Sequence, residues 1–152
     1  MPLENKNLDE TAWKLLELLQ QDARMSYKDL ARHVGLTPPA VAERLKKLED
    51  AGIIRGYTAD LDLAALGRPL VGFIRLSATG DKFPFLDHIT ENIPESLEFH
   101  RITGGDSYML KVAVRDMAHL ESVLDRLSPY CTPTTSLVIS SPLPTRIVRP
   151  LP

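Results

Sequence analysis

Polar and basic side chains recur between residues 37 and 47, in types that contact the edges and phosphates of nucleic acids. Arginine can pair with a guanine edge, a carboxylate can accept from a cytosine amine, and lysine neutralises phosphate. Arg44 and Glu43 are the two candidate readers of bases in this segment, and Thr37, Lys46 and Lys47 suit phosphates. The full set of candidate DNA contacts is Thr37, Pro39, Ala40, Glu43, Arg44, Lys46 and Lys47.

Arg44 and Glu43 each have an alternative role that does not involve a DNA base. Arg44 could support the fold by pairing with an acid, and Glu43 could simply repel phosphate. Net charge does not decide between them, because the whole chain carries −2. Between Arg24 and Arg55, seven cations face four anions. This local excess indicates a moderate basic patch, although an ordinary solvated surface would look the same.

A glycine-rich turn is the second place where the sequence could do chemistry. Glycine tolerates positive φ, and Gly104 and Gly105 would leave backbone N–H groups open to a carboxylate. Asp106 could then accept a hydrogen bond from an ammonium group. This pattern predicts a site for a small zwitterion. The alternative is a plain hairpin turn, which needs glycine only for its backbone geometry.

Patterns of catalysis and metal binding are missing from the sequence. It has no phosphate-binding loop, no dinucleotide fingerprint and no motif that pairs a nucleophile with a base, so we expect no enzyme, no catalytic residue and no cofactor. The histidines lack the spacing of a metal site and are expected on the surface or in caps; they are His33, His88, His100 and His119.

Cellular location is constrained by what the chain does not contain. The single cysteine, Cys131, cannot form an internal disulfide, which fits a reducing cytoplasm. No stretch is long and apolar enough to cross a membrane, and the first residues do not resemble a secretory leader. We therefore expect a cytoplasmic protein without a membrane partner.

Three helices must position the basic segment. Apolar residues recur at helical spacing, and Asp, Ser and Thr stand where N-caps are needed. In the third helix, Val41, Leu45 and Leu48 form the buried stripe, and Trp13 is expected in the core beside the stripe of the first. A helix over residues 9–21, one from Ser26 to Gly35, one from Thr37 to Gly52, and a β-prone strand over residues 53–59 predict a winged helix-turn-helix in residues 1–60.

The glycine turn belongs to a different arrangement. After a linker at 61–66, residues 67–142 alternate between strand and helix patterns, and a proline-rich, extended tail follows at 143–152. The order βαββαβ predicts an α+β chain whose second domain is ferredoxin-like. Its predicted elements are strands at 70–76, 97–103, 108–114 and 134–140, a helix at 83–92 and a helix after the cap Asp116.

A βαββαβ unit leaves one face of its sheet without helices. The strands carry more apolar surface than two helices need, and an uncovered apolar face usually pairs with another copy. We therefore expect self-association. The residues that support this expectation are Leu70, Phe73, Ile74, Leu110, Val112, Leu137 and Ile139.

The motifs together resemble one family. The chain is similar to the leucine-responsive/asparagine regulators (Lrp/AsnC), and the similarity runs from about residue 8 to residue 142. The residues that carry it are Leu8-Asp9, Leu19-Gln20-Gln21-Asp22-Ala23-Arg24, Leu30-Ala31, Val34-Gly35-Leu36-Thr37, Val41, Arg44-Leu45-Lys46-Lys47-Leu48-Glu49, Gly52-Ile53-Ile54-Arg55-Gly56-Tyr57, Thr103-Gly104-Gly105-Asp106-Ser107-Tyr108 and Thr134-Thr135-Ser136.

This resemblance implies a bacterial or archaeal transcription factor, associated with the nucleoid, that binds double-stranded DNA. It implies a homodimer formed through the second domain, often assembled further to an octamer, with an amino acid bound between subunits. The implied effector residues are Thr103, Gly104, Gly105, Asp106, Tyr108, Thr135 and Ser136. An architectural protein that bends or wraps DNA without an effector would use the same domains and remains the second reading.

Overall fold

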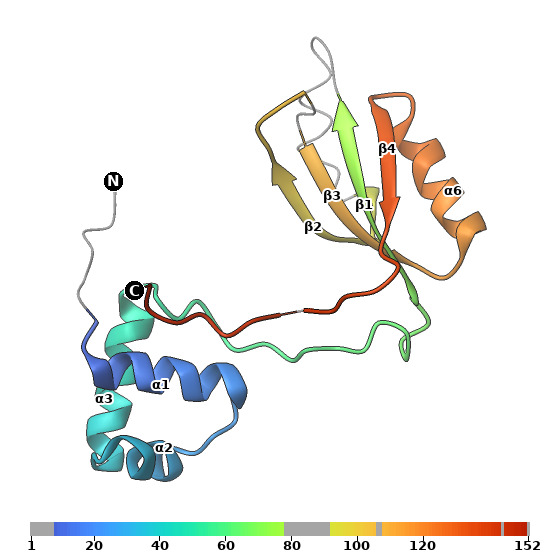
Figure 1. The fold of residues 1–152 in the computed structure, drawn as a ribbon. Helices are drawn as coiled ribbons and strands as arrows, with labels where there is room; N and C mark the ends of the chain where they lie inside the picture. Colours follow the sequence, from blue (N-terminus) through green and yellow to red (C-terminus); the bar gives the residue numbers. More distant parts are fainter. Residues whose placement is uncertain (1–7, 78–91, 106–107, 144, 152) are drawn as a thin grey trace. The chain divides into compact units, whose positions relative to one another are not determined.

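The computed structural model describes residues 8–77, 92–105, 108–143 and 145–151 of the chain. It divides into two compact units (Figure 1). The helical unit comprises Met1–Asp60 with Leu143–Pro152, and the sheet unit comprises Leu61–Pro142. The segment 61–66, predicted as a linker, groups with the sheet unit, and the tail groups with the helices.

Three helices form the helical unit, and each begins at its predicted cap. The Asp9 carboxylate accepts from the Ala12 N–H at 2.7 Å. The Ser26 hydroxyl caps the second helix by accepting from the Asp29 N–H at 3.1 Å, and it donates to the Asp29 carboxylate at 2.6 Å. The helices are α1 (Glu10–Gln21), α2 (Tyr27–Val34) and α3 (Pro38–Asp50), and Gly35 ends α2 in the left-handed conformation.

The core of the helical unit contains the predicted stripe of α3 but not Trp13. Val41, Leu45 and Leu48 are all buried on α3, and they pack with Ala12, Leu15, Leu18, Leu30 and Ala31. Trp13 is only half-buried and stands outside this cluster, so its assignment to the core is wrong. It follows Ala12 directly and is therefore turned away from the buried stripe of α1.

The segment after α3 is not a strand, contrary to the prediction for residues 53–59. A strand requires a neighbouring backbone for its hydrogen bonds, and the segment makes no strand ladder with the rest of the described chain. Its first two N–H groups, of Ile53 and Ile54, donate to the backbone oxygen of Leu48 at 2.9 and 3.2 Å, and a side-chain contact holds Tyr57. The Tyr57 hydroxyl donates to Glu49 at 2.9 Å. Partial burial of the hydroxyl is the larger cause and this hydrogen bond the smaller cause that raise the pKa of Tyr57 to about 12.

The sheet unit has the predicted ferredoxin-like topology. Its four strands lie in the order β2-β3-β1-β4, and every neighbouring pair is antiparallel. The helix α6 lies against one face (Figure 1). The elements are β1 (Leu70–Ser77), β2 (Ser96–Arg101), β3 (Tyr108–Val114), α6 (Met117–Leu127) and β4 (Thr132–Leu137). The helix predicted at 83–92 lies, apart from Asn92, outside the described residues.

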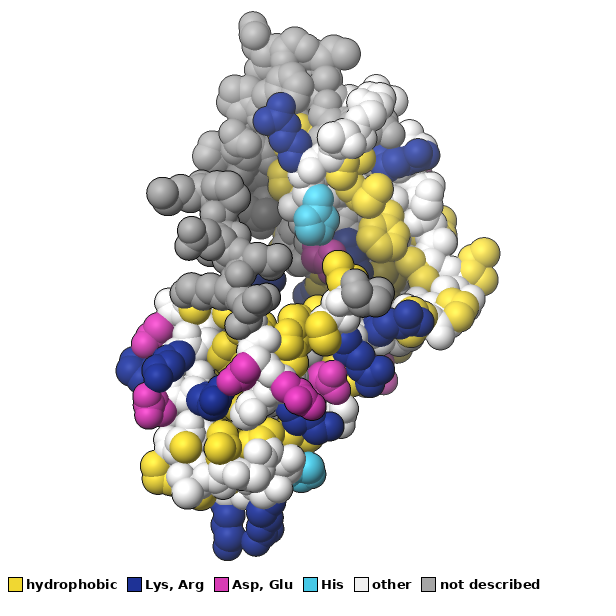
Figure 2. Space-filling model, turned by 60° about the vertical axis from the view of Figure 1, so that its left-hand side comes forward, with side chains coloured by type: hydrophobic (Ala, Val, Ile, Leu, Met, Phe, Trp, Pro, Cys, Tyr) yellow, Lys and Arg dark blue, Asp and Glu magenta, His cyan; other side chains and the backbone are white. Residues whose placement is uncertain are grey.

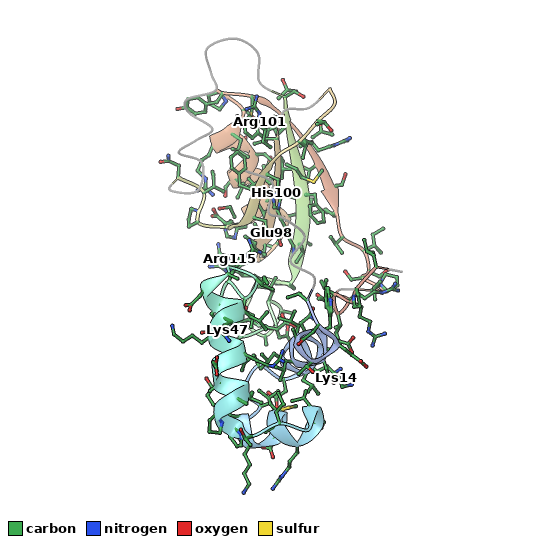
Figure 3. The ribbon with its side chains drawn as sticks, turned by 90° about the vertical axis from the view of Figure 1, so that its left-hand side faces the viewer. Lys14, Lys47, Glu98, His100, Arg101 and Arg115 are labelled. Carbon is green, nitrogen blue, oxygen red and sulfur yellow. The ribbon has the colours of Figure 1, made fainter. Side chains whose placement is uncertain are left out.

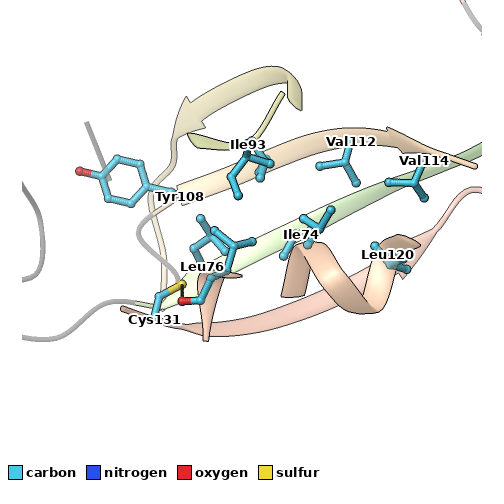
Figure 4. Close-up of a cluster of buried hydrophobic side chains, with 11 residues drawn as sticks. Ile74, Leu76, Ile93, Tyr108, Val112, Val114, Leu120 and Cys131 are labelled. Carbon is cyan, nitrogen blue, oxygen red and sulfur yellow. Dashed lines mark hydrogen bonds between the residues drawn. The ribbon is translucent and has the colours of Figure 1, made fainter. Parts of the chain in front are cut away.

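Alternation along the strands separates the two faces of the sheet. Ile74, Leu110 and Val112 are fully buried in the cluster shown in Figure 4, where α6 packs. These three residues therefore belong to the face that α6 covers and add nothing to an uncovered apolar face. The opposite face carries Phe73, paired with Lys111, and a hydrogen bond of 2.7 Å joins Lys111 to Glu98. This face is more polar than the sequence pattern indicated.

The last strand begins and ends earlier than predicted. It spans Thr132–Leu137 rather than residues 134–140, and Pro133 pairs with Leu76. Sequence reasoning avoids proline in strands because it cannot donate to the ladder, but an edge strand such as β4 tolerates it.

The described residues contain no group of three His, Cys, Asp or Glu residues arranged to hold a metal ion. None of their helices is long and apolar enough to cross a bilayer.

Candidate nucleic-acid interface and effector turn

The face of α3 opposite its buried stripe is open to solvent. Pro39, Glu43, Lys46 and Lys47 are exposed, and Figure 3 shows Lys47 projecting from this helix. Ala40 and Arg44 are half-buried at its border. The Thr37 hydroxyl caps the helix by accepting from the Ala40 N–H at 3.4 Å. The second helix of a helix-turn-helix presents such a face to the major groove.

The cations of this face are paired with carboxylates in the DNA-free protein. Lys47 donates to Glu43 at 2.7 Å, and Lys46 lies 3.2 Å from Asp50. The hydrogen bond from Lys47 lowers the pKa of the Glu43 carboxyl. Figure 2 shows basic and acidic side chains interspersed over the helices. Because exposed ion pairs of this kind are weak, phosphates can replace the carboxylates at little cost.

In this structure Arg44 pairs with an acid, which is the alternative role predicted for it. It donates to Asp9 Oδ2 at 2.6 Å, while Oδ1 of the same carboxylate caps α1. The hydrogen bond from Arg44 is the main cause that lowers the pKa of Asp9. The pair ties α3 to the start of α1. Contact between Arg44 and a base stays a prediction, which requires the arginine to leave Asp9.

Asp9→Asn tests whether Arg44 is available to DNA. Asparagine also caps helices well, so α1 should remain folded, whereas the charge that holds Arg44 is lost. We expect tighter DNA binding and a salt dependence steeper by up to about 0.9 in log–log slope, the contribution of one additional phosphate contact. Fluorescence anisotropy over a salt series measures both quantities.

The matched control is Asp22→Asn, which makes the same change in charge at the exposed C-cap of α1. It should change the slope much less. If the two variants behave alike, the gain is one of net charge, and Arg44 serves the fold alone.

The glycine turn is exposed, as a ligand site requires. Thr103, Gly104 and Gly105 all lie at the surface, and Gly104 has φ 116°, a conformation that favours glycine. Asp106 lies outside the described residues. Tyr108 is only 7% exposed and its ring stacks on Phe99 with centroids 5.1 Å apart, so this ring belongs to the core.

The remaining effector candidates lie elsewhere on the sheet. The turn joins β2 and β3, whereas Thr135 and Ser136 are on β4 at the opposite edge. The strand β1 separates β3 from β4, which puts two strand spacings, or about 10 Å, between them. Thr135 and Ser136 are also consecutive and point to opposite faces. The described members of the predicted effector set therefore lie on two separate parts of the sheet.

A partly buried cluster of polar side chains in the sheet unit was missed by sequence reasoning. His119 and Arg126 both approach Glu95 Oε1 at 2.8 Å, and the Glu95 side chain is only 12% exposed. Burial acts to raise the pKa of Glu95, but these hydrogen bonds outweigh it and the pKa is lowered. Among the described residues, Glu95 Oε2 finds no hydrogen-bond partner. His119 had been expected as a surface or capping residue, and no local pattern links it to Glu95.

Comparison with known proteins adds the family. Residues 8–55, which contain all three helices, match the model of a winged helix-turn-helix DNA-binding domain. Residues 72–148 match the model of the Lrp/AsnC ligand binding domain. The chain belongs to the Lrp/AsnC family. It is thus a helix-turn-helix transcriptional regulator, as the sequence motifs predicted.

Individual Lrp/AsnC proteins resemble this one over most of their length. The transcriptional regulator LrpC of Bacillus subtilis is 31% identical over 88% of this chain and 92% of its own. The leucine-responsive regulatory protein of Haemophilus influenzae is 35% identical over 79% and 74% of the two chains. The regulator NMB0573 of Neisseria meningitidis, solved as a complex with L-Met, superposes with a TM-score of 0.86 at 32% identity, covering 93% and 96%.

Proposed function

We propose that this Lrp/AsnC regulator binds double-stranded DNA through the exposed face of α3, and that an amino acid bound between copies of the chain modulates its assembly or its DNA binding. The single observation that carries the first part is the geometry of α3. This helix follows the tight turn at Gly35, buries one stripe in the core and leaves the face with Lys46 and Lys47 to solvent. Such a regulator works on the nucleoid, in the cytoplasm.

Lys47→Ala tests the DNA interface. Lys47 is suited to a phosphate, so its loss should weaken binding to all sequences alike and flatten the salt dependence by about one unit in log–log slope. Anisotropy titrations on a specific and an unrelated duplex measure both effects. The control is Lys14→Ala, which removes an exposed lysine from α1 instead (Figure 3). Equal losses in the two variants would argue against α3 as the interface.

The effector part of the proposal is supported by the separation of its candidate residues. The exposed turn at residues 103–105 and the edge strand β4 lie on opposite sides of β1 in the sheet, which favours a site that draws on a second copy. The regulator from Neisseria meningitidis was solved with L-Met, which supports an amino acid as the ligand class. We therefore propose a homodimer and, as family resemblance implies, a higher assembly such as an octamer.

Calorimetry with the standard amino acids tests the effector. We expect heat of binding for at least one of them, accompanied by a change in oligomer size or DNA affinity, because a ligand held by two copies favours the assembly that completes its site. Asp106→Ala should abolish this response and leave ligand-free DNA binding intact. If no amino acid gives heat or changes the size, the protein is better described as an architectural DNA-binding protein.

A further inference from the structure

The outer surface of α1 carries a stripe that the core does not use. Trp13, Glu17 and Gln20 recur at the spacing i, i+4 and i+7 and therefore lie on one face of the helix. Trp13 is half-buried although it lies outside the core cluster, and the Glu17 side chain is only 23% exposed. Contacts outside the helical core therefore cover part of the Trp13 and Glu17 side chains.

The tail makes the contacts at the end of this stripe. Gln20 Nε2 donates to the backbone oxygen of Val148 at 3.0 Å, and the Val148 N–H donates to Gln20 Oε1 at 2.8 Å. A primary amide carries N–H donors beside a carbonyl acceptor, so one of its edges matches both polar groups of one residue in an extended chain. The contact is made by the backbone, since the Val148 side chain remains 64% exposed.

Neighbouring contacts extend the docking along α1. Arg149 lies 3.8 Å from Glu17, which places a cation of the tail against the one acid of the stripe. Trp13 lines two adjoining surface hollows, and tail residues line them too: Val148 in one and Pro150 in the other. Figure 1 shows the C-terminal segment returning to the helices. The tail thus follows the stripe over Trp13, Glu17 and Gln20.

We propose that this stripe is a binding groove for an extended peptide, and that its occupant is the chain's own tail, residues 147–150, clasped by Gln20. The tail continues directly from the sheet unit. Docking therefore adds a second, releasable connection between the two units, besides the covalent one near residue 60. Covalent attachment gives the tail a high effective concentration at the groove, so weak contacts suffice to hold it.

The single tryptophan makes docking measurable in the full-length protein. Trp13 lies in the groove, so release of the tail should expose its ring and raise its quenching by acrylamide. Gln20→Ala removes both hydrogen bonds to Val148 and keeps a strong helix former in α1. Val148→Pro removes the N–H donor from the tail. We expect the ratio of docked to released tail to fall about tenfold in Gln20→Ala.

Two matched controls separate docking from general disturbance. Gln21→Ala makes the same change at the next, exposed position of α1, and Leu151→Pro adds a proline to the tail where the side chain is 93% exposed. Both should leave the quenching of Trp13 as in the wild type. The proposal is overturned if Gln20→Ala and Val148→Pro also leave it unchanged, or if the controls raise it equally.

A mixed assembly tests whether the occupant is the chain's own tail. A Trp13→Phe chain with an intact tail is refolded together with a Val148→Pro chain that keeps Trp13. If Trp13 stays exposed, the tail docks within its own chain, as we propose. If its protection returns, the tail comes from a second copy and the assignment is wrong. Neither DNA nor effector is present, so failure of the proposed function would leave these results standing.

Discussion

Leu45→Ala is expected to lower the stability of the helical unit by about 2–5 kcal/mol, because a buried leucine loses both its transfer energy and its packing. Leu45 is 1% exposed at the centre of the α3 stripe, between α1 and α2. The expected result is an early melting transition that abolishes DNA binding while the sheet unit remains folded. Circular dichroism and DNA anisotropy over the same temperature range measure the two effects.

Leu45→Met is the control for this variant. It keeps the apolar volume and should cost less than about 1.5 kcal/mol. A single transition shifted equally for both units in Leu45→Ala would mean that the units unfold together and would contradict the division described here.

Glu95→Ala should have the next largest effect, on the sheet unit. It removes the acceptor shared by His119 and Arg126 and leaves their donors without it. Hydrogen bonds that involve a charged group are worth about 1.5–3 kcal/mol, so we expect a loss of roughly that size or somewhat more. Thermal unfolding of the sheet unit measures it. Glu121→Ala, an exposed acid on α6, is the control and should be nearly neutral.

The same cluster predicts how stability changes in acid. The pKa of Glu95 is lowered from its ordinary value of 4.5 in the folded protein. Its contribution is therefore complete above that value and is lost as the pH falls through the lower, folded one. We expect the stability of the wild type to decline more steeply below pH 4.5 than that of Glu95→Gln. Parallel declines in the two proteins would show that other carboxylates dominate.

Much of the fold could be predicted because its determinants are local. The caps at Asp9, Ser26 and Thr37 act on backbone groups a few residues away, and all were confirmed. The strand expected at 53–59 failed for the opposite reason. Its residues favour β structure, but a strand forms only where a partner backbone exists. Similarly, the bounds of β4 depend on its pairing with β1, which places Pro133 inside a strand.

In the candidate sites, too, features set by local sequence could be predicted and features that need a distant partner could not. The exposed face of α3 follows from helical periodicity and could be predicted residue by residue. The partner of Arg44 could not, since Asp9 lies 35 positions away in the sequence. The contact between Gln20 and Val148 spans 128 positions and uses the backbone of the tail, so no pattern of side chains in the sequence predicts it. Contacts that depend on how distant segments pack cannot be predicted from local sequence patterns.

The grouping of the tail with the helices gives the protein an order of assembly during synthesis. The helices leave the ribosome first, the whole sheet unit follows, and residues 143–152 come only after it. Domains generally fold as they emerge, so α1–α3 can form their core early, while the groove on α1 stays empty. The surface at Trp13 is then uncovered until the tail has been made. Arrival of the tail covers that surface, and a filled groove marks a chain whose sheet unit has already been made.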